Sequence, residues 1–153
     1  MEKETLITAM KNSISEVLET MFFLPLDFFD TDLWDLSALE KEGTLISRLS
    51  FTGPFEGHFI FFISKEPASS LTADFLGEDV ESISPDHVTD TVKEIINMLA
   101  GSTFAGYDDQ AVFDLGIPEL IDLDDIRGDG SGEEVLIKIN TLDNHLALKM
   151  VKT

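Results

Sequence analysis

The chain begins with a helical pattern of apolar residues. Between residues 4 and 23 they recur every three or four positions, as on one face of an amphipathic helix. They are Leu6, Ile7, Met10, Ile14, Val17, Leu18 and Met21. Pro25 ends the pattern, because proline removes a backbone donor. Residues 24–42 show no clear period and mix aromatic with acidic side chains, so we expect a loop or short helical turns there.

Two strand-like segments and a short helix follow. Residues 44–52 partly alternate between polar and apolar, and residues 57–63 are rich in aromatic and β-branched side chains. Gly53-Pro54 lies between them, and this pair is a turn signal, which predicts a β-hairpin. Residues 66–76 fit a short helix closed by Gly77.

A second long helix has a clear start. Ser84 is a good N-cap residue, Pro85 suits the first helical position, and the carboxylate of Asp86 complements the helix dipole. The apolar pattern that follows allows the helix to continue to Phe104 or Gly106. This is the longest helix that the sequence predicts with a defined N-terminus.

The chain closes with a second pair of strand-like segments, residues 135–140 and 145–151. Leu142-Asp143-Asn144 between them predicts a tight hairpin, and residues 118–123 are a candidate for one more strand. Taken together, the elements predict an α+β fold, an antiparallel sheet with two long helices packed on one face. The length fits a single domain over residues 1–153.

Composition narrows the class of protein. Hydrophobic residues make up 43% of the 153 residues, enough for a folded core. No apolar run approaches the roughly 18 residues of a membrane span, and the first residues lack the basic region of a signal peptide. The chain has no cysteine, which excludes disulfides and thiolate zinc sites. These features predict a cytoplasmic protein.

The charge is strongly negative, with 30 acidic against 10 basic residues and a net charge of −20. Nucleic acids and anionic membranes are therefore not expected partners, because both bind basic surfaces. Two interpretations stay open. The acidic surface serves solubility alone, or it meets a partner that presents lysines or a bound metal.

The second long helix carries the candidate chemistry. At about 100° per residue, its apolar side chains fall in one sector that must face the core, namely Val88, Val92, Ile95, Ile96 and Leu99. Asp90, Glu94 and Asn97 fall together on the opposite side, at spacings that stack side chains in a row. Polar residues on such a face are often merely solvated. Asn97 favours a specific role, because asparagine is a poor helix former.

The pattern Asp90-x-x-x-Glu94-x-x-Asn97, followed by Met98-Leu99-Ala100-Gly101, resembles the signature helix of the CheC/CheX/FliY phosphatases of bacterial chemotaxis. The single motif and its Ala-Gly context are most similar to the CheX branch. The first helix, the following hairpin and the segment Ile117–Ile121 are similar as well. Ser102 stands where the family often has asparagine.

The resemblance implies a protein aspartyl-phosphate phosphatase, a hydrolase whose substrate is a phosphorylated CheY-like response regulator. Asn97 would position the attacking water and Glu94 would pair with the regulator's active-site lysine. Asp90 would have a supporting role, orienting partner groups or the helix. No cofactor of its own is implied, and Mg²⁺ is expected in the regulator. The family also implies a homodimer. The alternative is a non-catalytic adaptor that binds a response regulator or a flagellar switch protein.

Other candidate sites are weaker. Ser15-x-x-x-Glu19-x-x-Phe22 on the first helix repeats the first two motif positions, but a phenyl ring replaces the amide, so we expect one functional site per chain. The histidines form no metal-binding motif. The acidic run from Asp122 to Glu133 does not fit a calcium loop, because Ile126 and Arg127 occupy positions that need an oxygen ligand and a glycine. The glycines at its end have no following helix or lysine, so we expect no phosphate loop.

Overall fold

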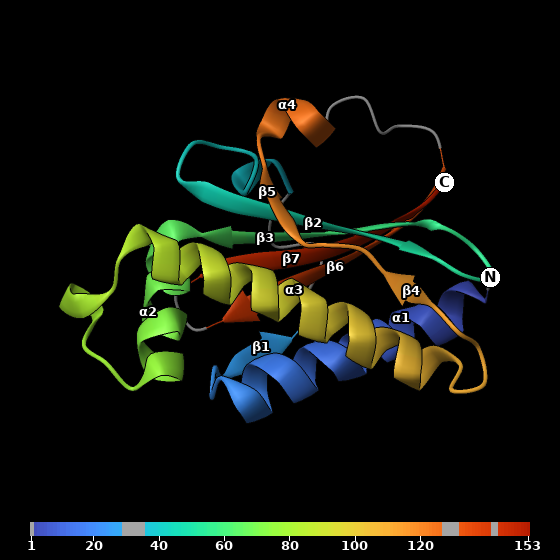
Figure 1. Cartoon of the computed structure of the whole chain (residues 1–153), viewed down its shortest axis with the longest axis horizontal. Coiled ribbons are helices and arrows are strands. Elements are labelled where there is room, and N and C mark those ends of the chain that lie inside the picture. The colour runs from blue at the N-terminus through green and yellow to red at the C-terminus, as the bar shows by residue number, and fades with distance from the viewer. Residues whose placement is uncertain (1, 29–35, 127–131, 142–143) are drawn as a thin grey trace.

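The computed structural model describes residues 2–28, 36–126, 132–141 and 144–153. These residues form an α+β fold, in which an antiparallel sheet is covered on one face by long helices (Figure 1), as the sequence predicts. The strands are β1 (Leu26–Phe28), β2 (Thr44–Thr52), β3 (Gly57–Ser64), β4 (Asp114–Leu115), β5 (Glu119–Ile121), β6 (Glu133–Thr141) and β7 (His145–Lys152).

Within the described residues the sheet has the order β1-β6-β7-β3-β2-β4, and β5 also pairs with β2. Both predicted hairpins are present as antiparallel pairs, β2 with β3 and β6 with β7. Residues 142–143 of the second turn lie outside the described residues. On either side of them the backbone N–H of Thr141 donates to the Asn144 carbonyl oxygen at 2.9 Å.

The central strand β3 explains why the sheet needs cover on both faces. Phe59, Phe61 and Ile63 belong to the large core beneath the helices, while Ile60 and Phe62 belong to a smaller cluster on the other face. All five side chains are buried. A strand buried on both faces has a nearly continuous apolar sequence instead of strict alternation, which is what this segment shows.

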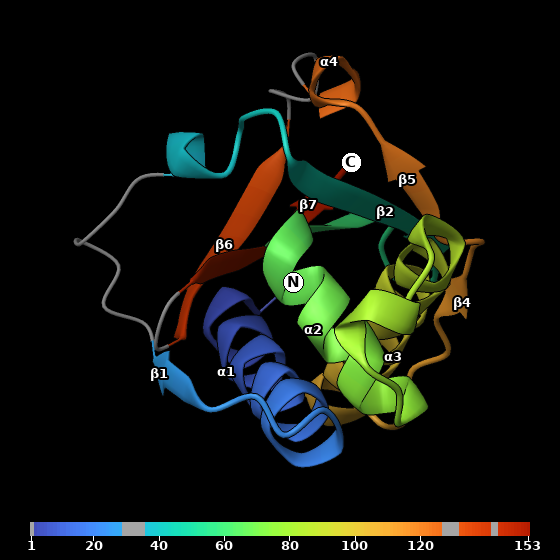
Figure 2. The same cartoon turned by 90° about the vertical axis from the view of Figure 1, so that its left-hand side faces the viewer.

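The helices divide between the two faces of the sheet. The long helices lie on one face, and the short helix α4 (Leu123–Ile126) lies on the other side (Figures 1 and 2). The helical segments are α1 (Lys3–Ile14), the π-helical segment η1 (Ser15–Met21), the short 3-10 turns η2 (Leu36–Ala38) and η3 (Val80–Ser82), α2 (Lys65–Leu76), α3 (Pro85–Tyr107) and α4 (Leu123–Ile126). No helix in the described part of the chain is long and apolar enough to span a membrane.

Three local features differ from the sequence-based expectation. The first helix does not run as one α-helix to residue 23, because η1 has π-type hydrogen bonds, such as Phe22 N–H to the Val17 carbonyl at 3.2 Å. Leu26–Phe28, expected as a loop or helical turn, pairs as β1 with β6. The two-residue strand β4 was not expected. Pairing with a partner strand, which periodicity does not reveal, produces both short strands. Residues 29–35 lie outside the described chain.

Candidate functional site

The start of α3 is fixed by a reciprocal cap. The His87 backbone N–H donates to Ser84 Oγ at 3.2 Å, and the Ser84 N–H donates to His87 Nδ1 at the same distance. Pro85 occupies the first helical turn, where its missing N–H costs nothing. The predicted N-terminus of this helix is confirmed, and the cap holds the turn that leads to Asp90.

The rest of α3 is anchored over its length. Its predicted core sector is confirmed, since Val88 is 7% exposed and Val92, Ile95, Ile96 and Leu99 are fully buried. Neighbouring α1 adds a buried hydrogen bond from Ser13 Oγ to the Leu99 carbonyl oxygen at 2.8 Å. Near the C-terminus the Phe104 ring packs edge-on against Phe51, with centroids 4.8 Å apart. A helix held in this way positions its outward side chains better than a loop can.

Asp90, Glu94 and Asn97 lie on the outward side of this helix. Asp90 and Glu94 are exposed, and Asn97 is half-buried. Across the described chain, no hydrogen bond or ion pair engages these three side chains. Neighbours at these spacings have Cβ atoms about 6 Å apart. Two carboxylates and one carboxamide are therefore presented together, with their hydrogen-bonding capacity free for a partner.

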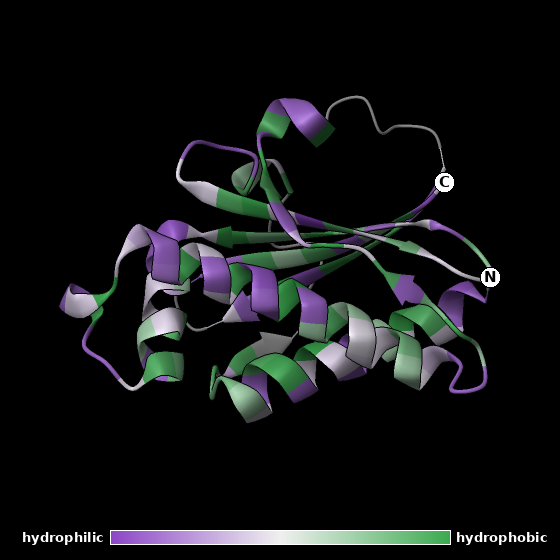
Figure 3. Ribbon diagram, viewed as in Figure 1, coloured by the Kyte–Doolittle hydropathy of each residue, from purple (hydrophilic) through white to green (hydrophobic). Residues whose placement is uncertain are grey.

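The N-terminal half of α3 is largely hydrophilic, whereas the strands of the sheet are largely hydrophobic (Figure 3). Gly101, one turn after Asn97, has open space where a Cβ would stand. No side chain therefore projects from the helix at position 101, and a partner can approach the Asn97 carboxamide closely from this side.

A hollow that sequence analysis missed lies beside the carboxylates. It has a volume of about 340 Å³ and is lined by residues from two helices, namely Phe75, Leu76, His87, Asp90, Thr91 and Glu94. Periodicity could not reveal it, because it depends on how the end of α2 meets the start of α3. The one feature of the sequence that could have indicated this hollow is the apolar pair Phe75-Leu76 directly before Gly77. Apolar residues at the end of a helix often pack against another element.

The possible motif copy on the first helix does not form a second face of this kind. Ser15 and Glu19 lie in the π-helical segment η1, where the spacing of a regular α-helix does not hold. Phe22 lies just beyond this segment, is 2% exposed and stacks on Phe75 with ring centroids 5.1 Å apart. It therefore packs in the core, and the single functional site stays a prediction.

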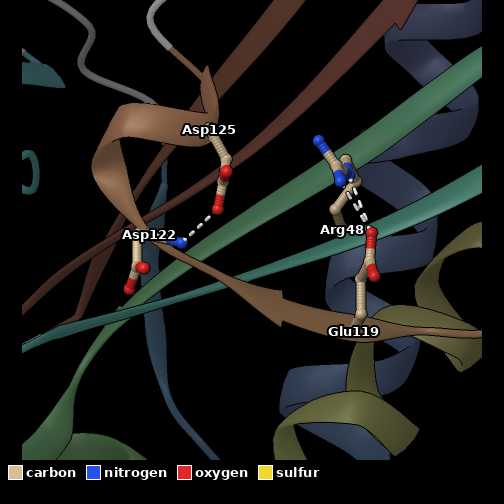
Figure 4. Close-up of polar contacts among 4 residues, drawn as sticks. All are labelled: Arg48, Glu119, Asp122 and Asp125. Carbon is tan, nitrogen blue, oxygen red and sulfur yellow. Dashed lines mark hydrogen bonds and ion pairs between the residues drawn. The ribbon is translucent and has the colours of Figure 1, made fainter.

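Acidic residues at the start of the run and just before it have structural roles. The Asp125 carboxylate accepts the backbone N–H of Asp122 at 2.9 Å and so fixes the start of α4, while Glu119 on β5 pairs with Arg48 on β2 at 2.7 Å (Figure 4). Asp129 lies outside the described residues. Among the residues that are described, no group of three or more histidine or acidic side chains is placed to hold a metal ion.

Fold and site together define a class of protein, an α+β domain that presents a carboxylate and a carboxamide from one rigid helix. The family model of the chemotaxis phosphatase CheX matches residues 45–140, which include α3, and the chain belongs to this family. No curated protein matches the chain in sequence.

Solved structures support the same fold. A CheX–CheY–BeF3–Mg²⁺ complex from Borrelia burgdorferi aligns with a TM-score of 0.76 and 18% identity, covering 95% of this chain and 96% of that chain. CheX from Vibrio vulnificus aligns with a TM-score of 0.72 and 18% identity, covering 97% and 96%. Thermotoga maritima FliY aligns with a TM-score of 0.62 and 11% identity, covering 97% and 86%. At these identities the similarity shows the fold alone.

Proposed function

We propose that this chain accelerates hydrolysis of the phosphoaspartate of a CheY-like response regulator. The observation that carries the proposal is the row Asp90, Glu94 and Asn97, which lies outward on an anchored helix with no partner among the described residues. Membership of the chemotaxis phosphatase family supports the reaction. The Borrelia burgdorferi complex supports a CheY-like partner and Mg²⁺ bound at that partner.

In the proposed mechanism Asn97 orients the attacking water. Its carboxamide oxygen accepts a hydrogen bond from the water, and its NH2 group donates to a phosphoryl oxygen. The water oxygen bonds to phosphorus as the bond between phosphorus and the aspartyl oxygen breaks. The regulator recovers its carboxylate, and both water protons leave with inorganic phosphate. A neutral amide suits this position, because a carboxylate would repel the phosphoryl group.

Glu94 takes the role of an anchor. Phosphoryl transfer depends on positioning and charge stabilisation more than on covalent chemistry, and the regulator supplies the metal ion and a lysine. We propose that the Glu94 carboxylate pairs with this lysine across the interface, which places Asn97 over the phosphoryl group. Asp90, one turn earlier on the same face, orients partner groups or the helix and does not react.

The active unit is proposed to be the whole chain, residues 1–153, as one domain. The homodimer implied by the family stays a prediction, and nothing in the mechanism requires it. One chain carries every residue that the mechanism uses, since Glu94 and Asn97 come from the same helix.

The test is a decay assay with the chain present at a small fraction of the concentration of phosphorylated regulator. A phosphatase removes many phosphoryl groups per chain, so we expect the whole regulator pool to lose phosphate faster than it does alone. An adaptor changes at most one regulator per chain. If the amount of phosphate lost faster never exceeds one phosphoryl group per chain, the adaptor hypothesis is correct and the phosphatase proposal is wrong.

A further inference from the structure

The hollow beside Glu94 has an apolar wall, formed by Phe75 and Leu76, that stays exposed to solvent in the folded chain. Phe75 and Leu76 form the last turn of α2 and are 49% and 42% exposed. The turn is fixed, since Gly77 adopts φ 67° and the Glu78 backbone N–H donates to the Ala73 carbonyl oxygen at 3.0 Å. Two large apolar side chains are thus held at the surface by a capped helix end.

One residue of this wall, Phe75, also packs against the core. The Phe75 ring stacks on buried Phe22, with an angle of 24° between the ring planes. This contact orients Phe75, and the side chain also lines the hollow together with Leu76. Exposed apolar area of this kind costs free energy in water and gains it when covered.

The opposite wall of the hollow is acidic. Asp90 and Glu94 line it from α3, and both are exposed. The chain that leaves Leu76 adds exposed Glu78, Asp79 and Glu81 in the following turns. An occupant that fits this arrangement has an apolar side chain flanked by lysine or arginine.

The hollow is large enough to take one side chain of a partner. Its volume of about 340 Å³ is at the lower end of ligand pockets, which span roughly 300–1,000 Å³. Its lining comes from two helices only. It also shares Asp90 and Glu94 with the proposed phosphatase site, so a partner that binds at that site lies next to the hollow.

We propose that the hollow is a docking subsite for the response regulator, which inserts an apolar side chain next to the cationic group that Glu94 pairs with. This inference rests on the proposed function and adds a recognition element to it. Apolar burial at Leu76 and Phe75 supplies affinity, while the acidic wall selects partners with a basic rim. The subsite acts on binding and leaves the chemistry of Asn97 unchanged.

The test variant is Leu76→Gln, which removes the apolar contact and keeps a good helix-forming residue. We expect KM for phosphorylated regulator, and Kd for a regulator carrying BeF3 and Mg²⁺, to rise about 10-fold, while kcat stays within about twofold because Asn97 is untouched. Leu76→Met, which is apolar and of similar size, should retain wild-type KM. Since the contact is apolar, the salt dependence of Kd should not change.

The matched control is Val112→Ser. Val112 is 74% exposed and follows the far end of α3, a helix of 23 residues that spans about 35 Å. The Val112→Ser variant should have the wild-type KM and Kd. Wild-type KM and Kd in Leu76→Gln would overturn the subsite while leaving the phosphatase proposal standing. A wild-type chain that neither binds nor dephosphorylates the regulator would overturn both.

Discussion

Asn97→Ala is expected to return the decay of phosphorylated regulator to its unassisted rate. Removal of one positioned hydrogen-bonding group that acts in the transition state costs about 10²–10³-fold in kcat. The fold should be unaffected, because the Asn97 side chain has no partner among the described residues. Alanine is also the better helix former, so the melting temperature should stay equal or rise slightly.

Two further variants test whether the effect requires the amide group of Asn97 itself. Asn97→Asp keeps the size of the side chain but loses the NH2 donor and adds a negative charge, so it should also be inactive. Asn12→Ala removes an exposed asparagine from α1 and should keep full activity. Circular dichroism and the decay assay on the same preparations provide the measurement. Wild-type turnover in Asn97→Ala would remove the water-positioning role.

Glu94→Ala is expected to act mainly on binding. Loss of one partner of an interprotein charge pair commonly costs about 2 kcal/mol or more, so Kd should rise by about 30-fold or more. The remaining affinity should depend less on salt, because one ion pair is gone. The measurement is titration calorimetry at two salt concentrations, with a regulator carrying BeF3 and Mg²⁺.

Glu19→Ala is the matched control for this variant. Glu19 is also an exposed glutamate on a helical segment, and it holds the corresponding place in the possible motif copy of η1. Binding and turnover should be unchanged in this variant. An unchanged Kd for Glu94→Ala would remove the anchoring role, and a large loss of activity for Glu19→Ala would contradict a single site per chain.

The arrangement of α3 could be predicted from the sequence because each of its determinants is local. The Ser84 cap, the Pro85 start and the apolar sector all act within a few residues, and together they fix which way Asp90, Glu94 and Asn97 point. Both hairpins were predictable for the same reason. Their strands are adjacent in sequence and separated by short turn signals.

Features that depend on distant contacts could not be predicted in this way. The strand Leu26–Phe28 exists because β6 pairs with it, and β6 follows more than a hundred residues later. The hollow beside Glu94 needs the end of α2 to lie against α3. The apolar edge of the first helix predicts that Phe22 packs inward, but not that its ring stacks on Phe75. Helical periodicity assigns a face to each helix but does not say which neighbour covers that face.

The most direct test is a crystal structure of this chain with a response regulator that carries BeF3 and Mg²⁺ in place of the phosphoryl group. The account predicts that the outward face of α3 lies over the regulator's site. The Asn97 carboxamide should be within hydrogen-bond distance, about 3 Å, of the in-line water position, and Glu94 should contact the lysine. A complex in which this face of α3 points away from the BeF3 group would contradict it.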